Sequence, residues 1–135
     1  MGMDIYGKMP TSEEGKYFRA NIWAWRRIQV LLKELCYGLI DSDLIAAMSF
    51  NEGAGVTEQH VCNEIANRFE KWLTRHPEGH QIESNLRVRK DNLLVHRSEL
   101  TPSELANTRT PYRITSEHLQ EWISFLRACG GFEVC

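Results

Sequence analysis

The feature that most constrains the fold is an apolar stripe between residues 57 and 76. Its members recur at the i, i+3, i+4 and i+7 spacing that places side chains on one face of an α-helix. They are Cys62, Ile65, Ala66, Phe69, Trp72 and Leu73. Thr57 is a suitable N-cap and Glu58 suits the first turn. Because Pro77 and Gly79 end the pattern, we expect an amphipathic helix here that must bury one face against other elements.

Two further helices are predicted from the same period. One runs from about Asn21 to Tyr37 and stops at Gly38, and the other follows a cap at Thr115 or Ser116 and stops at Gly130. Their stripes are Trp25, Ile28, Leu31, Leu32 and Leu35 in the first, and Leu119, Trp122, Ile123, Leu126 and Cys129 in the second. Shorter helical turns are predicted over 41–48 and after the capping box of residues 101–104.

Strand patterns occupy both ends of the chain and one internal segment. Residues 3–8 alternate between apolar and polar, residues 112–114 are extended, and residues 132–135 form a terminal strand. Between 86 and 96, two short apolar runs flank Lys90-Asp91-Asn92, and this pattern fits a β-hairpin better than a helix. The predicted class is α+β, with three to four helices packed on a small sheet formed by terminal strands and the hairpin.

Length and charge limit the function classes. A chain of 135 residues predicts a single domain over residues 1–135. The net charge of −2 is a poor match to a whole-domain nucleic-acid footprint, which is usually strongly basic. No apolar run approaches the roughly 20 residues that span a bilayer, and the start MGMDIYGKMP lacks the pattern of a secretory signal. We therefore expect a cytoplasmic protein with no membrane contact; the oligomeric state cannot be inferred.

No catalytic, metal or cofactor site is predicted. His76 and His80 have the i, i+4 spacing of a helical zinc site, but Pro77 and Gly79 interrupt the helix, so exposed loop histidines are expected. The four cysteines contain no C-x-x-C pair, and reduced thiols are expected. His60 and Cys62 point apart on a helix. Enzymatic activity stays uncertain, with none the favoured expectation.

The loop Asn51-Glu52-Gly53-Ala54-Gly55 has two glycines ahead of a helix, an arrangement that can cradle phosphate. It lacks the Lys and Ser/Thr of a P-loop, and Glu52 would repel an anion. A structural turn is the favoured interpretation.

Two basic patches form the candidate interaction surface. Trp23 lies opposite the core stripe of its helix, beside Arg26 and Arg27, so it should meet either a second element of the fold or a partner. The second patch is Arg87, Arg89, Lys90 and Arg97. If the first two alternate outward on a strand, they form a positive ridge, although such charge runs are usually only solvated surface.

Three blocks of the chain carry a resemblance. The opening MGMDIYGKMPTSEEGKYFRANIWAWR, the loop Asn51-Glu52-Gly53-Ala54-Gly55-Val56 and the ending Cys129-Gly130-Gly131-Phe132 resemble a family of uncharacterised bacterial and phage-encoded proteins. Glu52 stands where that family usually has Asp. Many members carry a cysteine-rich insertion before the last helix, which this chain lacks, so a metal role tied to it does not transfer. The resemblance implies a small accessory or anti-defence role.

Three functions are carried forward. The leading hypothesis is a non-enzymatic protein-interaction module, for example an inhibitor of a host defence complex such as a CRISPR effector. The second is a small-molecule or nucleotide binder, or a minor hydrolase, whose candidate pocket is Asp4, Tyr6, Arg19, Asn51 and Glu52. The third is a nucleic-acid-binding accessory that uses the basic patch of the hairpin.

Overall fold

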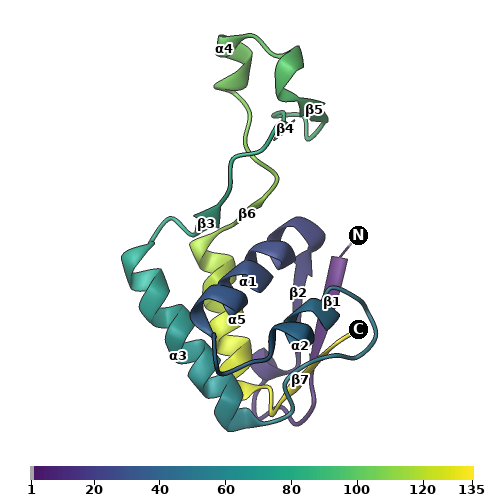
Figure 1. Ribbon diagram of the computed structural model, residues 1–135, viewed down its shortest axis with the longest axis vertical. Coiled ribbons are helices and arrows are strands. Elements are labelled where there is room, and N and C mark those ends of the chain that lie inside the picture. Colours follow the sequence, from purple (N-terminus) through teal and green to yellow (C-terminus); the bar gives the residue numbers. More distant parts are fainter. Residues whose placement is uncertain (1) are drawn as a thin grey trace.

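The computed structural model describes residues 2–135 and shows a body of helices and sheet from which one long arm projects (Figure 1). The helices are α1 (Ile22–Leu35), α2 (Ser42–Ala47), α3 (Gln59–Arg75), α4 (Pro102–Leu105) and α5 (Ser116–Ala128), with 3-10 turns η1 (Glu13–Gly15) and η2 (Arg97–Glu99). The strands are β1 (Gly2–Gly7), β2 (Tyr17–Asn21), β3 (His80–Gln81), β4 (Leu86–Val88), β5 (Leu94–His96), β6 (Arg113–Ile114) and β7 (Phe132–Val134). The predicted α+β class is confirmed.

The two ends of the chain meet in one antiparallel sheet of order β2-β1-β7. In the central strand, Ile5 lies opposite both Phe18 and Val134. Successive residues of a strand point to opposite faces, so one face of the sheet is buried and the other is exposed. The buried face consists of Met3, Ile5, Phe18, Ala20, Phe132 and Val134.

The core fills the space between this sheet and the helices α1, α3 and α5. Trp122 of α5 lies at its centre, with ring centroids 5.2 Å from Phe18, 5.6 Å from Trp25 and 5.6 Å from Phe132. These contacts tie α5 to β2, α1 and β7 at once. The three predicted apolar stripes supply this core, and α3 runs along α5 in Figure 1.

The helix boundaries follow their caps. The Asn21 side chain accepts the Ala24 amide hydrogen at 2.8 Å, and the Thr115 hydroxyl accepts that of His118 at 3.2 Å, which confirms the predicted starts of α1 and α5. The predicted N-cap at Thr57 is wrong, because α3 begins at Gln59 with Glu58 as its N-cap. The reason is tertiary: residues 54–56 pair with the C-terminal strand, with the Phe132 amide donating to the Val56 carbonyl at 2.7 Å.

The arm, defined here as residues 82–111, leaves the body between β3 and β6. These two strands pair at its base, with His80 opposite Ile114 and Gln81 opposite Arg113. Beyond them, β4 and β5 form the predicted hairpin, in which Arg87 lies opposite Val95. The predicted capping box starts α4, since Thr101 and Glu104 exchange backbone-to-side-chain bonds of 2.9 and 3.2 Å. Figure 1 shows β4, β5 and α4 standing clear of the body helices.

Candidate functional site

The centre of the arm is an arginine rather than an apolar side chain. Arg87 is only 9% exposed. Its guanidinium donates from Nε to Thr108 Oγ1 at 3.0 Å, from Nη2 to the Thr108 carbonyl at 3.1 Å and from Nη1 to Glu83 Oε2 at 3.2 Å. These bonds join β4 to the returning chain. The expected outward ridge of Arg87 and Arg89 is therefore wrong, because Arg87 points inward to hold the arm together.

The remaining basic residues of the hairpin patch are partly neutralised, since Arg97 shares Glu83 with Arg87. Arg89 Nη2 lies 3.0 Å from Asp91 Oδ2, and Arg97 Nη1 lies 3.3 Å from Glu83 Oε2. Within residues 2–135, Lys90 has no ion pair. Affinity for nucleic acid comes largely from Lys and Arg side chains that neutralise phosphates and so release the counterions condensed on the nucleic acid, and among the described residues of this patch Lys90 alone lacks an ion pair.

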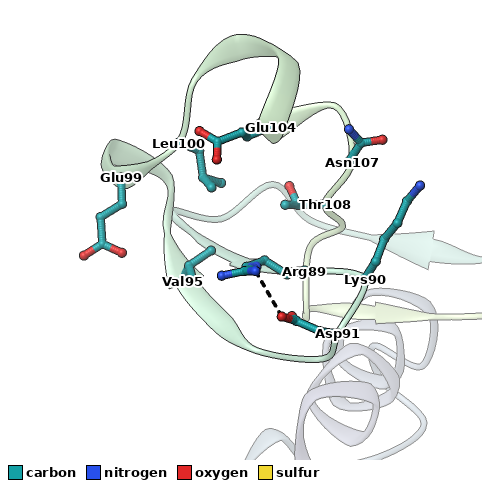
Figure 2. Close-up of a pocket in the computed structure, with 9 residues that line it drawn as sticks. All are labelled: Arg89, Lys90, Asp91, Val95, Glu99, Leu100, Glu104, Asn107 and Thr108. Atoms are coloured by element: carbon teal, nitrogen blue, oxygen red, sulfur yellow. Dashed lines mark ion pairs between the residues drawn. The ribbon is translucent and has the colours of Figure 1, made fainter.

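The arm encloses a pocket of about 500 Å³ between the hairpin, η2 and the returning chain (Figure 2). It is lined by Arg89, Lys90, Asp91, Val95, Glu99, Leu100, Glu104, Asn107 and Thr108. In Figure 2, Val95 and Leu100 point toward its middle while Glu99 points away. Both lining cations, Arg89 and Lys90, belong to the predicted basic patch, but the apolar floor was not predicted. The chain between residues 95 and 108 has to fold back before Val95 and Leu100 face one opening.

The polar groups of this pocket are mostly engaged within the arm. The Glu104 carboxylate caps α4, the Asn107 amide donates to the Ser103 carbonyl at 3.2 Å, and the Thr108 hydroxyl donates to the Leu105 carbonyl at 2.7 Å. What faces the opening is therefore half-buried aliphatic surface beside the Arg89–Asp91 pair. Such a surface suits a side chain of another protein better than a small polar ligand.

Trp23 was expected to meet either a second element of the fold or a partner, and it meets a second element. Its ring is edge-on to Tyr112 at 4.8 Å, which pins the returning chain to α1 at the base of the arm. Arg27, one turn later, lies over the same tyrosine ring at 5.4 Å. It is only 7% exposed, which contradicts its place on an interaction surface, while Arg26 is exposed. Burial lowers the pKa of Arg27, and its Nε and Nη1 have no hydrogen-bond partner.

The two candidate zinc histidines both pack on Trp72. His76 stacks on its ring at 4.1 Å and is exposed, as expected, whereas His80 meets the ring edge at 5.6 Å and is half-buried, which the sequence analysis did not expect. Burial, with Arg27 nearby, lowers the pKa of His80. Among the described residues, no group of three or more His, Cys, Asp or Glu side chains is placed to hold a metal ion.

The five residues of the candidate pocket do not converge. Asp4 and Arg19 are cross-strand neighbours, and Arg19 Nη1 lies 3.5 Å from Asp4 Oδ1. The Tyr17 hydroxyl donates to Asp4, and this hydrogen bond raises the pKa of Tyr17. Asn51 and Glu52 lie instead beside the opposite edge of the sheet, where Ala54 bridges to Val134. Two strand spacings, about 10 Å, separate β2 from β7, and residues 51 and 52 lie beyond β7. The expected pocket is therefore wrong for this combination of residues.

The glycines of the 51–55 loop have a structural use. Gly53 has φ +89°, and its amide donates to the Val134 carbonyl at 2.7 Å. A Cβ on Gly55 would lie 2.0 Å from the Phe132 carbonyl oxygen. The loop is thus fitted against β7, in agreement with the structural turn that the sequence favoured.

Two of the three buried cysteines, Cys36 and Cys62, have a raised thiol pKa, whereas the hydrogen bond with Cys62 lowers the pKa of Cys129. Cys36, Cys62 and Cys129 are buried free thiols. Burial raises the pKa of Cys36 to about 11, and a hydrogen bond with Cys129, together with burial, raises that of Cys62. A thiol with a raised pKa holds little of the reactive thiolate at neutral pH. His60 pairs with Glu58 at 3.3 Å, away from Cys62.

Comparison with known proteins gives no relative from which a function could be inferred. No family model, curated protein or solved structure matches this chain. Over residues 2–135, no helix has the length and apolar character needed to cross a membrane.

Proposed function

We propose that this protein is a non-enzymatic interaction module that binds a protein partner through its arm. The observation that supports this most is the lack of an apolar core in the arm. From residue 82 to residue 109, all of which the structure describes, the single buried side chain is that of Arg87. The aliphatic side chains of this segment are half-buried or exposed, so they remain available to a second molecule.

The exposed aliphatic residues of the arm are the expected contact points. Leu93 and Leu94 at the hairpin are 55% and 49% exposed, and Ile82 near the base is 43% exposed. Burying the exposed half of one leucine against a partner would contribute about 1 kcal/mol. Val95 and Leu100 add a separate half-buried aliphatic surface in the arm pocket, bordered by charged residues, which is the usual anatomy of a protein interface.

A more specific role is part of the same proposal. The resemblance of the opening, loop and ending blocks to phage-encoded proteins supports a small accessory of a phage, acting in the cytoplasm on a host defence complex. A projecting arm that inserts into a larger assembly is a simple way for a small chain to block it. Nucleic-acid binding by the hairpin patch has less support, because its arginines are paired.

The test compares three proteins in two experiments. Each is used to capture partners from host lysate, and each is mixed with purified defence effectors and analysed by size-exclusion chromatography. The three proteins are the wild type, Leu93→Asp in the arm and Met9→Asp on the body. Both positions are exposed apolar side chains, at 55% and 75%, so the two variants add the same charge at different places. We expect the wild type and Met9→Asp to form the same complex and Leu93→Asp to lose it. A complex that Leu93→Asp retains, or the lack of any complex, would contradict the proposal.

A further inference from the structure

A second concavity, of about 450 Å³, lies where the arm joins the body. We call it the basal cleft. It shares no lining residue with the arm pocket. Its body side is formed by the first turns of α1 and α5, including Trp23 and His118, and its arm side by the hairpin turn, including Asn92 and Leu94. The returning chain completes it with Arg109 and Arg113.

The charge of the basal cleft is positive throughout. Two arginines line it, and no Asp or Glu belongs to its lining. Arg109 Nη2 donates only to the Asn92 side-chain oxygen, at 3.3 Å, and within residues 2–135 Arg113 has no ion pair. In a chain of net charge −2, in which each arginine of the hairpin patch contacts a carboxylate, this cleft places side by side in one lining two arginines that have no ion pair within residues 2–135.

Two backbone dipoles add to these side chains. The caps of α1 and α5, Asn21 and Thr115, both line the cleft, so the positive ends of two long helices converge there. His118 Nε2 lies 2.8 Å from the Arg19 carbonyl, which can only accept, so that nitrogen carries a proton. Neither helix end would suffice alone; together with the two arginines they make the cleft favourable for an anion.

A buried cation strengthens the case from behind the cleft wall. Arg27 follows Trp23 by one helical turn and contacts the same tyrosine, Tyr112. Its Nε and Nη1 are buried without a hydrogen-bond partner. A buried guanidinium without a counter-charge is costly, and although Arg27 does not line the cleft, it adds a positive charge one helical turn from Trp23.

We infer that the basal cleft binds a nucleoside phosphate, with Arg109 and Arg113 on the phosphate groups and Trp23 against the base. Guanidinium groups match phosphate oxygens in a bidentate geometry, and an aromatic ring provides a stacking surface for a base. The volume suits one nucleotide rather than a length of polymer. This site shares Leu94 with the proposed partner interface, but Leu93, the residue whose substitution tests that interface, is not among its lining residues, so the two proposals can fail separately.

The decisive experiment is calorimetric titration of the full chain with ATP, inorganic pyrophosphate, adenosine, a short oligonucleotide and a glutamate-rich peptide. We expect ATP to bind more tightly than pyrophosphate and adenosine not to bind. ATP should also quench the fluorescence of Trp23, and Trp23→Phe should remove that part of the signal, because the other tryptophans lie outside the cleft lining.

The variants are Arg109→Gln, Arg113→Gln and, as a matched control, Lys33→Gln. Lys33 lies in the last turn of α1, at the end away from the cleft, and its substitution changes the net charge by the same amount. Each arginine variant should weaken ATP binding about tenfold, the loss typical of one charge-assisted hydrogen bond, and the control should not. Thermal melts and circular dichroism check that each variant is folded.

Several results would overturn the inference. They are no heat with ATP and pyrophosphate up to millimolar concentration, equal affinity of ATP and adenosine, or equal affinity of Arg113→Gln and Lys33→Gln for ATP. If the oligonucleotide or the acidic peptide bound and ATP did not, the cleft would belong to a different class of ligand and the inference would be overturned.

Discussion

Arg27 and Arg87 are the two most deeply buried charged side chains that the structure describes, and they are stabilised differently. Arg87 donates to both Thr108 oxygens and to Glu83, so its charge and its hydrogen-bond donors are satisfied. Arg27 has the face of Tyr112 and no carboxylate. A cation–π contact offsets only part of the cost of desolvating a guanidinium. The uncompensated charge of Arg27 then acts on its neighbours, above all on His80.

The position of His80 gives the protein a specific pH dependence. Burial, Arg27 and His76 lower the pKa of His80 below 6.5 in the folded protein, against the opposing effect of Glu34. Between that lowered value and 6.5 the unfolded chain binds a proton that the folded chain does not, so the contribution of His80 to stability falls as the pH falls below about 6.5. We expect His80→Gln to flatten this part of the stability profile in urea unfolding between pH 8 and pH 5.5.

The matched control is His60→Gln, because His60 is exposed and is not among the groups that shift the pKa of His80. It should leave the pH dependence close to that of the wild type. Equal profiles for the wild type and His80→Gln would show that protonation of His80 is not linked to unfolding.

At the scale of elements, the arm is held by polar contacts where the body is held by apolar ones. Arg87 joins β4 to the returning chain, and the Val88 and Arg109 backbones exchange hydrogen bonds of 2.7 and 3.0 Å beside it. We expect Arg87→Met to lower the local stability of the arm by about 1–3 kcal/mol, because Thr108 and Glu83 lose their donor. Hydrogen exchange should speed up at β4, β5 and residues 105–110, and α3 should exchange as in the wild type.

Arg89→Met provides the comparison for that experiment. Arg89 is exposed and makes one surface pair with Asp91, and such pairs are worth little. Its exchange pattern should resemble that of the wild type. If Arg87→Met and Arg89→Met gave the same pattern, the central role assigned to Arg87 in the arm would be wrong.

Local signals explain what the sequence could predict. The hairpin around Lys90-Asp91-Asn92, the capping box at Thr101 and the three amphipathic helices depend on nearby residues, and all are confirmed. β2 was missed because its pairing with β1 joins segments more than ten residues apart, and the turn-rich stretch before it obscured the alternation of Tyr17–Asn21. Arg87 was placed outward because a strand pattern does not show which face the rest of the chain will cover.

The candidate sites show the same limit more strongly. Trp23 meets a second element of the fold, Tyr112, which is one of the two alternatives predicted for it. The grouping of Asp4 with Asn51 failed, because shared polarity does not imply spatial proximity. The basal cleft could not have been predicted, since Arg109, Arg113 and Trp23 come together only when the arm returns to the start of α1.

At the scale of the whole molecule, the body and the arm differ in what stabilises them. The hydrophobic core consists of residues from Met3 to Leu73 and from Ile114 to Val134, and none of its members lies in the arm. β3 and β6 close the arm at its base, with the Ile82 amide donating to the Tyr112 carbonyl at 3.0 Å. The chain could therefore pass from β3 to β6 through a tight turn without disturbing a single core contact.

Excision of the arm tests this division. If residues 83–110 are replaced by a Gly-Ser linker of about four residues, β3 and β6 should form an ordinary hairpin and the body should keep its fold. We expect a Tm within about 5 °C of the wild type, because the buried apolar area is unchanged and the linker loop is shorter. The same protein should lose both the protein partner and ATP, since it lacks Leu93 of the proposed interface and Arg109 of the basal cleft. Aggregation, or a Tm lowered by more than about 10 °C, would mean that the arm stabilises the body after all, at the cleft that Leu94 and the first turn of α1 line together.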